Sequence, residues 1–179
     1  TQMVAKGHDF PEVTLAAILD ADATLRFPDF RAEERTFSLV TQLAGRSGRS
    51  RAGGRVIVQT LAPGSPSISH AATHDSAGFL SGELDRRREL GYPPFSHLIR
   101  IQLAAEAEPE VDQAANLVAD RLDSALPAGA DLLGPAPMFR ARNRYRRRLL
   151  IRSTTRAESI RAVQETIERL LADRSLQKI

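Results

Sequence analysis

Two short apolar runs, separated by one amphipathic segment, constrain the fold of this chain more than any other feature. Residues 13–19 form a nearly unbroken apolar run, and residues 55–60 contain a second one. Such runs are typical of strands buried on both faces of a parallel sheet. Because a helix between two strands lets them run parallel, the order strand, helix, strand predicts a parallel α/β unit.

The segment between the runs predicts a helix over residues 31–45. Asp29 is a favourable N-cap, and Glu33 and Glu34 lie in the first turn, where the helix dipole favours acidic side chains. The helical spacing of apolar residues gives the helix one buried face. That face comprises Phe37, Val40, Leu43 and Ala44.

Residues 66–95 predict a helical connector. A short helix is expected over residues 68–74, and Asp75 is placed to cap a longer one that ends at Leu90, with Gly91 as its stop. The sequence Tyr-Pro-Pro-Phe at 92–95 cannot be helical and marks a boundary.

Residues 96–179 predict a second, α+β domain of order β-α-β-β-α. Strands are expected over residues 97–103, 131–134 and 145–153, and a helix opens at Pro109. The last helix is expected to begin with a capping box of Thr155 and Glu158. The predicted fold class is therefore a partial α/β unit, residues 1–65, followed by the connector and an α+β sandwich with its helices on one face.

Composition excludes several kinds of site. The chain has no cysteine, so disulfides, thiol catalysis and thiolate zinc sites are excluded within it. No apolar run is long enough to cross a bilayer and no leader is recognised, so we expect a cytoplasmic location. His70 and His74 have the spacing of helical metal ligands, but no neighbouring acid completes a site, and we expect no bound metal.

A basic cluster dominates the charge pattern of the second half. Six arginines and one tyrosine lie between positions 140 and 148: Arg140, Arg142, Arg144, Tyr145, Arg146, Arg147 and Arg148. Arginines beside an aromatic ring suit DNA phosphate contacts and base stacking. Strand alternation would place Arg144, Arg146 and Arg148 on one face and Arg147 on the other. The alternative is an exposed edge strand protected by charge.

A second group of arginines closes the first predicted helix. Residues 42–49 read Gln-Leu-Ala-Gly-Arg-Ser-Gly-Arg, with Arg46 and Arg49 three positions apart. Such a pair can reach a phosphate across an interface between two lobes and stabilise the charge that develops during hydrolysis. The alternative is a solvated helix C-terminus, where arginines are favourable anyway.

Residues 1–11, Thr-Gln-Met-Val-Ala-Lys-Gly-His-Asp-Phe-Pro, precede the first predicted strand. Together with residues 42–49 they resemble motifs V and VI of superfamily 2 helicases. The resemblance implies that Arg46 and Arg49, with Gln42 as a polar partner, approach the phosphates of ATP. It also implies coupling of ATP to nucleic acid by motif V, here Thr1, Gln2, Lys6, Gly7 and Asp9.

A narrower resemblance covers essentially the whole chain. Residues 1–11, 19–22 (Leu-Asp-Ala-Asp), 28–36 and 88–95, which include Gly-Tyr-Pro-Pro-Phe, are similar to the primosomal protein N′ (PriA) family of bacterial replication-restart helicases. The chain resembles the C-terminal fragment of that family. Its first part then corresponds to part of the second RecA-like motor lobe, and residues 96–179 to the DNA- and partner-binding domain.

The resemblance implies a function for the longer protein. It is an ATP-dependent 3′–5′ DNA helicase that recognises stalled or forked DNA and restarts replication by primosome assembly. ATP and Mg²⁺ act in the full-length protein, and zinc occupies a cysteine-rich insertion that this chain lacks. The fragment itself is expected to be inactive, because half of the nucleotide site lies on the other lobe.

The resemblance also implies partners. These are forked and single-stranded DNA, single-stranded DNA-binding protein and other primosome proteins, in the bacterial cytoplasm near the nucleoid. Arg156 matches a basic residue of the site for the acidic tail of single-stranded DNA-binding protein, and Arg161 is a candidate by its helix position. The alternative function is a non-enzymatic DNA-binding or scaffold module of the primosome.

Overall fold

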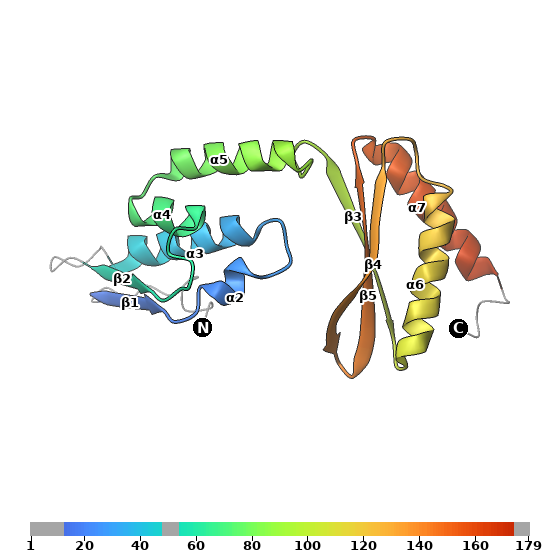
Figure 1. Cartoon of the computed structure of the whole chain (residues 1–179), viewed down its shortest axis with the longest axis horizontal. Coiled ribbons are helices and arrows are strands. Elements are labelled where there is room, and N and C mark those ends of the chain that lie inside the picture. Colours follow the sequence, from blue (N-terminus) through green and yellow to red (C-terminus); the bar gives the residue numbers. More distant parts are fainter. Residues whose placement is uncertain (1–12, 48–53, 174–179) are drawn as a thin grey trace. The chain divides into compact units, whose positions relative to one another are not determined.

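Figure 1 shows the computed structural model of the chain, which describes residues 13–47 and 54–173. The chain forms two compact units, Thr1–Arg86 and Arg87–Ile179. Residues 66–95, expected to connect the two parts, are divided between these units. No helix among the described residues is both long enough and apolar enough to cross a membrane.

The first unit contains the predicted parallel α/β arrangement. Strand β1 (Leu15–Ile18) pairs in parallel with β2 (Arg55–Val58), so that Leu15 lies opposite Arg55. Helix α3 (Ala32–Ser47) lies between the two strands in sequence, close to the predicted bounds. A short helix that the sequence did not predict, α2 (Asp22–Leu25), follows β1.

The core of the first unit lies where α3 meets the sheet and the next helix, α4 (Pro66–Ala72). Ile18 of β1, Val40 of α3 and Ile68 of α4 are buried together there. The ring of Phe37 on α3 stacks on that of Phe79 on α5 (Ser76–Glu89), with 4.2 Å between ring centroids. Helix α4 therefore belongs to the core of the first unit.

The prediction that the two parallel strands are buried on both faces is wrong. Burial alternates along both strands, and Leu15 and Ile57 are each more than half exposed. The apolar runs are long enough for two-sided burial, but the described helices that pack on this sheet share one core. An apolar face of β1 and β2 is therefore left open to solvent within the described residues.

Helix α5 begins and ends as the sequence predicts. The Asp75 carboxylate accepts the backbone N–H of Gly78 at 2.8 Å, which satisfies a free donor of the first turn. At the other end Gly91 has φ +62°, and the N–H of Tyr92 donates to the carbonyl of Arg87 at 2.8 Å. This is the left-handed C-terminal geometry that glycine permits.

The second unit has the predicted β-α-β-β-α order. Its elements are β3 (His97–Ala105), α6 (Glu108–Asp123), β4 (Asp131–Ala141), β5 (Arg144–Ser153) and α7 (Arg156–Ala172). The three strands form an antiparallel sheet of order β3-β5-β4. Both helices cover one face of it (Figure 1), where Leu122 of α6 and Val163 of α7 pack against Leu149 and Ile151.

Strand β4 is much longer than predicted. The sequence ended it at Gly134, but it continues to Ala141. Gly134 has φ +105°, and the pairing register with β5 shifts between Leu133 and Ala136. A Cβ at position 134 would lie 2.6 Å from the carbonyl oxygen of Arg148. The glycine therefore marks a bulge inside the strand rather than its end.

The predicted capping box of α7 is absent. Thr155 is the N-cap residue, but its side chain makes no capping hydrogen bond. Its hydroxyl instead lies 3.2 Å from that of Ser153, which also accepts the Thr155 N–H at 3.1 Å. The Ser159 hydroxyl donates to the same Ser153 oxygen at 2.8 Å. This local network at the end of β5 replaces the reciprocal bonds that Thr155 and Glu158 would make.

Hydrogen bonds and one contact between an arginine and an aromatic ring hold the Gly-Tyr-Pro-Pro-Phe segment in place within the second unit. The Ser96 hydroxyl donates to the carbonyl of Gly91 at 2.6 Å, and Arg152 of β5 donates to the carbonyl of Leu90 at 2.5 Å. The Arg88 guanidinium lies 4.6 Å from the ring centroid of Phe95. These contacts fix the path of a segment whose prolines prevent helix formation.

Candidate nucleic-acid interface

The basic cluster lies on the hairpin between β4 and β5. Arg142 and Asn143 have φ of +51° and +61° and lie between the paired residues Ala141 and Arg144. Two successive positive φ angles are typical of a type I′ turn, whose twist matches that of the flanking strands. Asparagine suits this conformation, whereas arginine adopts it rarely. The hairpin was not predicted from the sequence, because the predicted strand ended at Gly134, whereas β4 continues to Ala141.

Strand alternation divides the arginines as the sequence predicts. Leu149 and Ile151 of β5 are fully buried under the helices. Arg144, Arg146 and Arg148 therefore lie on the opposite face, because successive residues of a strand point to opposite faces. We call this surface the open face of the second unit.

The register of the sheet extends the open face across all three strands, because directly opposed residues share a face. It comprises Leu98, Arg100, Gln102 and Ala104 of β3, Arg144, Arg146, Arg148, Leu150 and Arg152 of β5, and Asp131, Leu133, Ala136, Met138 and Ala141 of β4. Five of these residues are arginines and one, Asp131, is acidic. The open face is therefore strongly basic.

Two arginines of the open face make solvent-exposed polar contacts. Arg146 donates to the side-chain oxygen of Gln102 at 2.8 Å, and Arg144 lies 3.6 Å from the carboxylate of Glu106. The Arg144 and Glu106 side chains are both more than half exposed, so their attraction is largely screened by water. A polyanion can therefore compete for these guanidinium groups. Arg152 differs, since it pairs with Asp131 at 2.7 Å.

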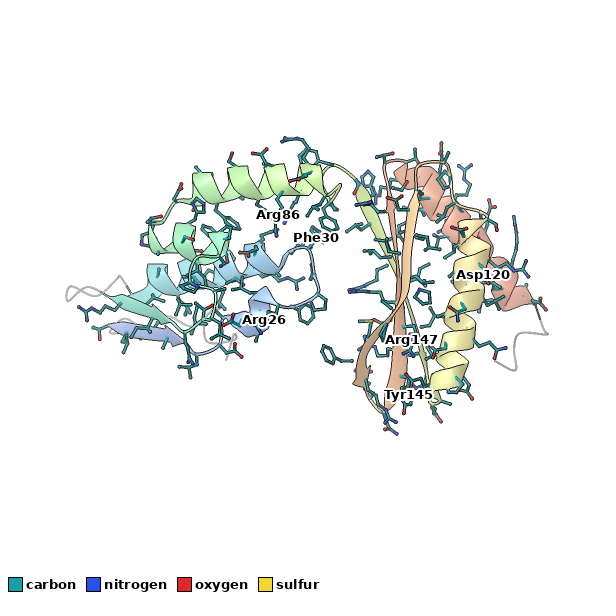
Figure 2. All side chains as sticks on the ribbon, viewed as in Figure 1. Arg26, Phe30, Arg86, Asp120, Tyr145 and Arg147 are labelled. Atoms are coloured by element: carbon teal, nitrogen blue, oxygen red, sulfur yellow. The ribbon has the colours of Figure 1, made fainter. Side chains whose placement is uncertain are left out.

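Arg147 has a structural role on the other face of β5. Its guanidinium is buried and forms ion pairs with Asp112 and Glu108 of α6, the latter at 2.9 Å. The hydrogen bonds that the Arg147 guanidinium donates, first to Asp112 and then to Glu108, raise the pKa of Arg147 above its ordinary value. Figure 2 labels Arg147 on the sheet beside α6. This arginine ties β5 to the helix.

The aromatic ring of the cluster is partly covered. Tyr145 is half-buried, and the Arg140 guanidinium lies 4.6 Å from its ring centroid. A second ring nearby, that of Phe139, is 85% exposed. Sequence reasoning missed both Phe139 and Arg100. The alternation of residues 97–103 could have placed Arg100 on the face of its strand that points away from the core. That Arg100 lies beside Leu150 of β5, between its arginines, follows only from the strand register.

The candidate residues of the first unit are only partly described. Gln42 is exposed on α3, its amide nitrogen donates to the Ser38 hydroxyl at 2.7 Å, and it lines a hollow of about 580 Å³ together with Glu34 and Arg35. Arg46 lies in the last turn of α3. The Arg46 side chain lies outside the described part of the chain. The other candidate residues of this unit also lie outside it: Thr1, Gln2, Lys6, Gly7, Asp9 and Arg49.

The two candidate partner-binding arginines lie on α7. Arg156 is the first residue of that helix, and both Arg156 and Arg161 are exposed. Five residues of an α-helix correspond to a rotation of about 140° around its axis. The two side chains therefore leave the helix in different directions.

The two histidines do not form a metal site in the structure. His70 lies 2.9 Å from Asp75, whose carboxylate caps α5. The hydrogen bond from the Gly78 backbone and then that from His70 lower the pKa of Asp75 below its ordinary value. No group of three or more potential ligands for a metal occurs among the described residues.

Comparisons with known proteins match both units. Residues 88–179 match the model of the primosomal protein N C-terminal domain. The chain is 42% identical over 154 residues to replication restart protein PriA of Bacillus subtilis, covering 85% of this chain and 19% of that protein. It is 40% identical over 154 residues to PriA of Synechocystis, covering 85% and 18%.

A third relative matches a longer part of the chain. Replication restart protein PriA of Chlamydia trachomatis serovar D is 36% identical over 171 residues, or 93% of this chain and 22% of that protein. The chain thus spans about a fifth of the length of these curated relatives.

Proposed function

Because the chain belongs to the family of replication restart proteins PriA, we propose that it is the C-terminal part of an ATP-dependent DNA helicase and that its open face contacts DNA. The observation that carries this proposal is the set of five arginines on one face of the second unit. One guanidinium group can bind two oxygens of a phosphate at once. Its binding also releases counterions from DNA, and this release favours association independently of the base sequence.

For the first unit we propose a place in the second motor lobe of that helicase. The parallel pairing of β1 and β2, with α3 between them in sequence, supports this assignment. In this proposal Gln42, Arg46 and Arg49 approach the phosphates of ATP, and Thr1, Gln2, Lys6, Gly7 and Asp9 couple the nucleotide to DNA. Arginines so placed stabilise negative charge that develops during phosphoryl transfer.

The proposed setting is replication restart in the bacterial cytoplasm, with translocation from 3′ to 5′ on forked DNA and assembly of the primosome. The relatives are named replication restart proteins, which supports the role in replication restart. In the same proposal Arg156 and Arg161 contribute to binding the acidic tail of single-stranded DNA-binding protein. ATP with Mg²⁺ supplies the phosphoryl chemistry in the full-length protein, and zinc belongs to an insertion outside this chain.

The DNA-binding proposal is tested on the open face. We expect the double variant Arg146→Ala/Arg148→Ala to weaken binding of forked DNA by about tenfold in fluorescence anisotropy, since two phosphate contacts are lost. Arg169→Ala is the control, because it removes an exposed arginine of α7, away from the open face. Equal affinities of the double variant and the wild type would contradict the proposal.

The motor proposal needs the full-length protein. There, Arg46→Ala and Arg49→Ala should each lower DNA-stimulated ATP turnover by about a thousandfold, the scale of an arginine finger. Unchanged turnover would remove the arginine-finger assignment.

A second candidate function is a DNA-binding or scaffold module that needs no nucleotide. It is favoured because all five arginines of the open face lie in the second unit. If the full-length protein does not hydrolyse ATP in the presence of forked DNA but binds that DNA, the scaffold function holds instead.

A further inference from the structure

Phe139 near the tip of the β4–β5 hairpin is exposed far beyond what its chemistry favours. Its exposed fraction is 85%, the highest among the large apolar side chains of the described residues. Single exposed apolar residues are ordinary on protein surfaces. Phe139, however, lies on a hairpin that also exposes Arg142 and Arg144, and this combination of an aromatic ring with cations indicates a ligand.

An irregularity in the hairpin places this residue. Met138 pairs with Arg146 and Ala141 with Arg144, so two residues of β4, Phe139 and Arg140, oppose the single residue Tyr145 of β5. Such a bulge leaves one residue without a place in the hydrogen-bonded ladder and redirects its side chain. Arg140 is turned over the Tyr145 ring, at 4.6 Å from its centroid. Phe139 is left without a ring partner in the described structure.

The charges around Phe139 indicate the chemistry of the ligand. Arg142 and Arg144 are exposed in the turn and at the start of β5, and Arg146 follows on the open face. Cations on the same hairpin as an exposed aromatic ring suit a polyanion that carries flat apolar groups. Bases of a single strand expose their faces for stacking, whereas bases of a duplex stack on one another. An unpaired DNA strand therefore fits this combination better than a duplex does.

We propose that the hairpin tip, residues 139–144, captures an unpaired DNA strand by stacking a base on Phe139 while Arg142 and Arg144 contact its phosphates. This inference rests on the proposed DNA-binding function and adds a preference for single strands, with Phe139 as the residue that provides it. The open face then follows the backbone of the same or the adjacent DNA segment. Tyr145, covered by Arg140, supports the hairpin rather than the base.

A tryptophan at position 139 gives a direct readout, since the chain contains none of its own. In the full chain, Phe139→Trp should lose a large part of its emission when a 15-nucleotide single strand is added, because a stacked base quenches indole fluorescence. A blunt duplex of the same sequence should change it little. Leu171→Trp is the control: Leu171 is 71% exposed on α7, and its tryptophan should respond to neither DNA.

Affinities measured by anisotropy complete the experiment. Phe139→Ala and Phe139→Leu should each weaken single-strand binding about 5- to 100-fold, since leucine keeps apolar area but lacks a ring for stacking. Both should leave duplex binding within about twofold. Phe139→Trp should restore single-strand affinity. Because the side chain is exposed, these substitutions leave the fold in place.

The outcomes separate this inference from the function on which it rests. Wild-type binding that weakens in Arg146→Ala/Arg148→Ala but not in Phe139→Ala would overturn the inference alone. Equal weakening of single-strand and duplex binding in Phe139→Ala, or quenching of Leu171→Trp equal to that of Phe139→Trp, would also overturn it. Failure of the wild-type chain to bind any DNA would overturn the proposed DNA-binding function, and the inference with it.

Discussion

Arg142, at the tip of the hairpin, has a backbone conformation that is unfavourable for arginine. It has φ +51°, in the left-handed region that costs a side-chain-bearing residue roughly 1–2 kcal/mol. Its neighbour Asn143, at φ +61°, is a residue type that tolerates this region. Strained residues persist where the surrounding structure fixes them, and they are common at functional sites. A cation held at the turn despite this strain is consistent with contact to DNA.

This strain gives a prediction with two opposite signs. Arg142→Asn should raise the free energy of unfolding by about 0.5–1 kcal/mol in urea denaturation, because asparagine relieves the backbone. The same variant should bind single-stranded DNA more weakly, since a phosphate contact is lost. Arg140→Asn is the control, because Arg140 has no positive φ and loses its contact with Tyr145. Equal stabilisation by both variants would contradict the role of strain.

At the scale of elements, β4 depends on the bulge at Gly134. A Cβ there would meet the backbone oxygen of Arg148 at 2.6 Å, and the φ of +105° disfavours any other residue. The bulge allows β4 to continue past Gly134 and to pair with β5 as far as Ala141. The hairpin and its exposed tip therefore depend on one glycine in the middle of a strand.

Gly134→Ala should lower the free energy of unfolding by about 2–3 kcal/mol, since it combines backbone strain with a clash against the main chain. Gly129→Ala separates the two effects: Gly129 has φ +82°, but nothing lies within 4 Å of its added Cβ. We expect it to cost clearly less. Similar losses in the two variants, measured by thermal unfolding, would show that the clash at Arg148 contributes nothing.

The start of α5 gives a pH prediction. The pKa of Asp75 is lowered because its carboxylate accepts the Gly78 N–H and contacts His70. The charged form therefore stabilises the folded state fully above the ordinary pKa of 3.8, and this contribution disappears as the pH falls through the lower folded value.

The melting temperature of the wild type should exceed that of Asp75→Asn at pH 6, and this difference should shrink below pH 3.8. Asp120→Asn, at an exposed position of α6 labelled in Figure 2, is the control. A difference between wild type and Asp75→Asn that stays constant from pH 6 to pH 2.5 would rule out the charged cap.

The elements that follow from local pattern were predictable, and those that depend on distant contacts were not. Asp75 and Gly91 bound α5 as expected, because caps act within a few residues. The extent of β4 depends on its pairing with β5, which comes later in the sequence. Gly134 and Pro135 inside the strand made it look shorter than it is. The alternation of Arg144, Arg146 and Arg148 was predictable, but the exposed ring of Phe139 was not, since a bulge places it.

On the scale of the whole molecule, the two units differ in how the faces of their sheets are covered. The second unit buries one face of its sheet under α6 and α7 and leaves the other face basic. The first unit leaves Leu15 and Ile57 on an apolar sheet face that the described residues do not cover. In the proposed function, DNA contact belongs to the second unit and ATP chemistry requires the rest of the motor.

The salt dependence of DNA binding tests the central claim, contact of the open-face arginines with DNA phosphates, most directly. Each phosphate contact adds about 0.9 to the slope of log affinity against log salt concentration on duplex DNA. The triple variant Arg144→Ala/Arg146→Ala/Arg148→Ala should therefore lower the magnitude of the wild-type slope by about 2–3, whereas Arg169→Ala should leave it unchanged. A triple variant with the slope of the wild type would contradict the account.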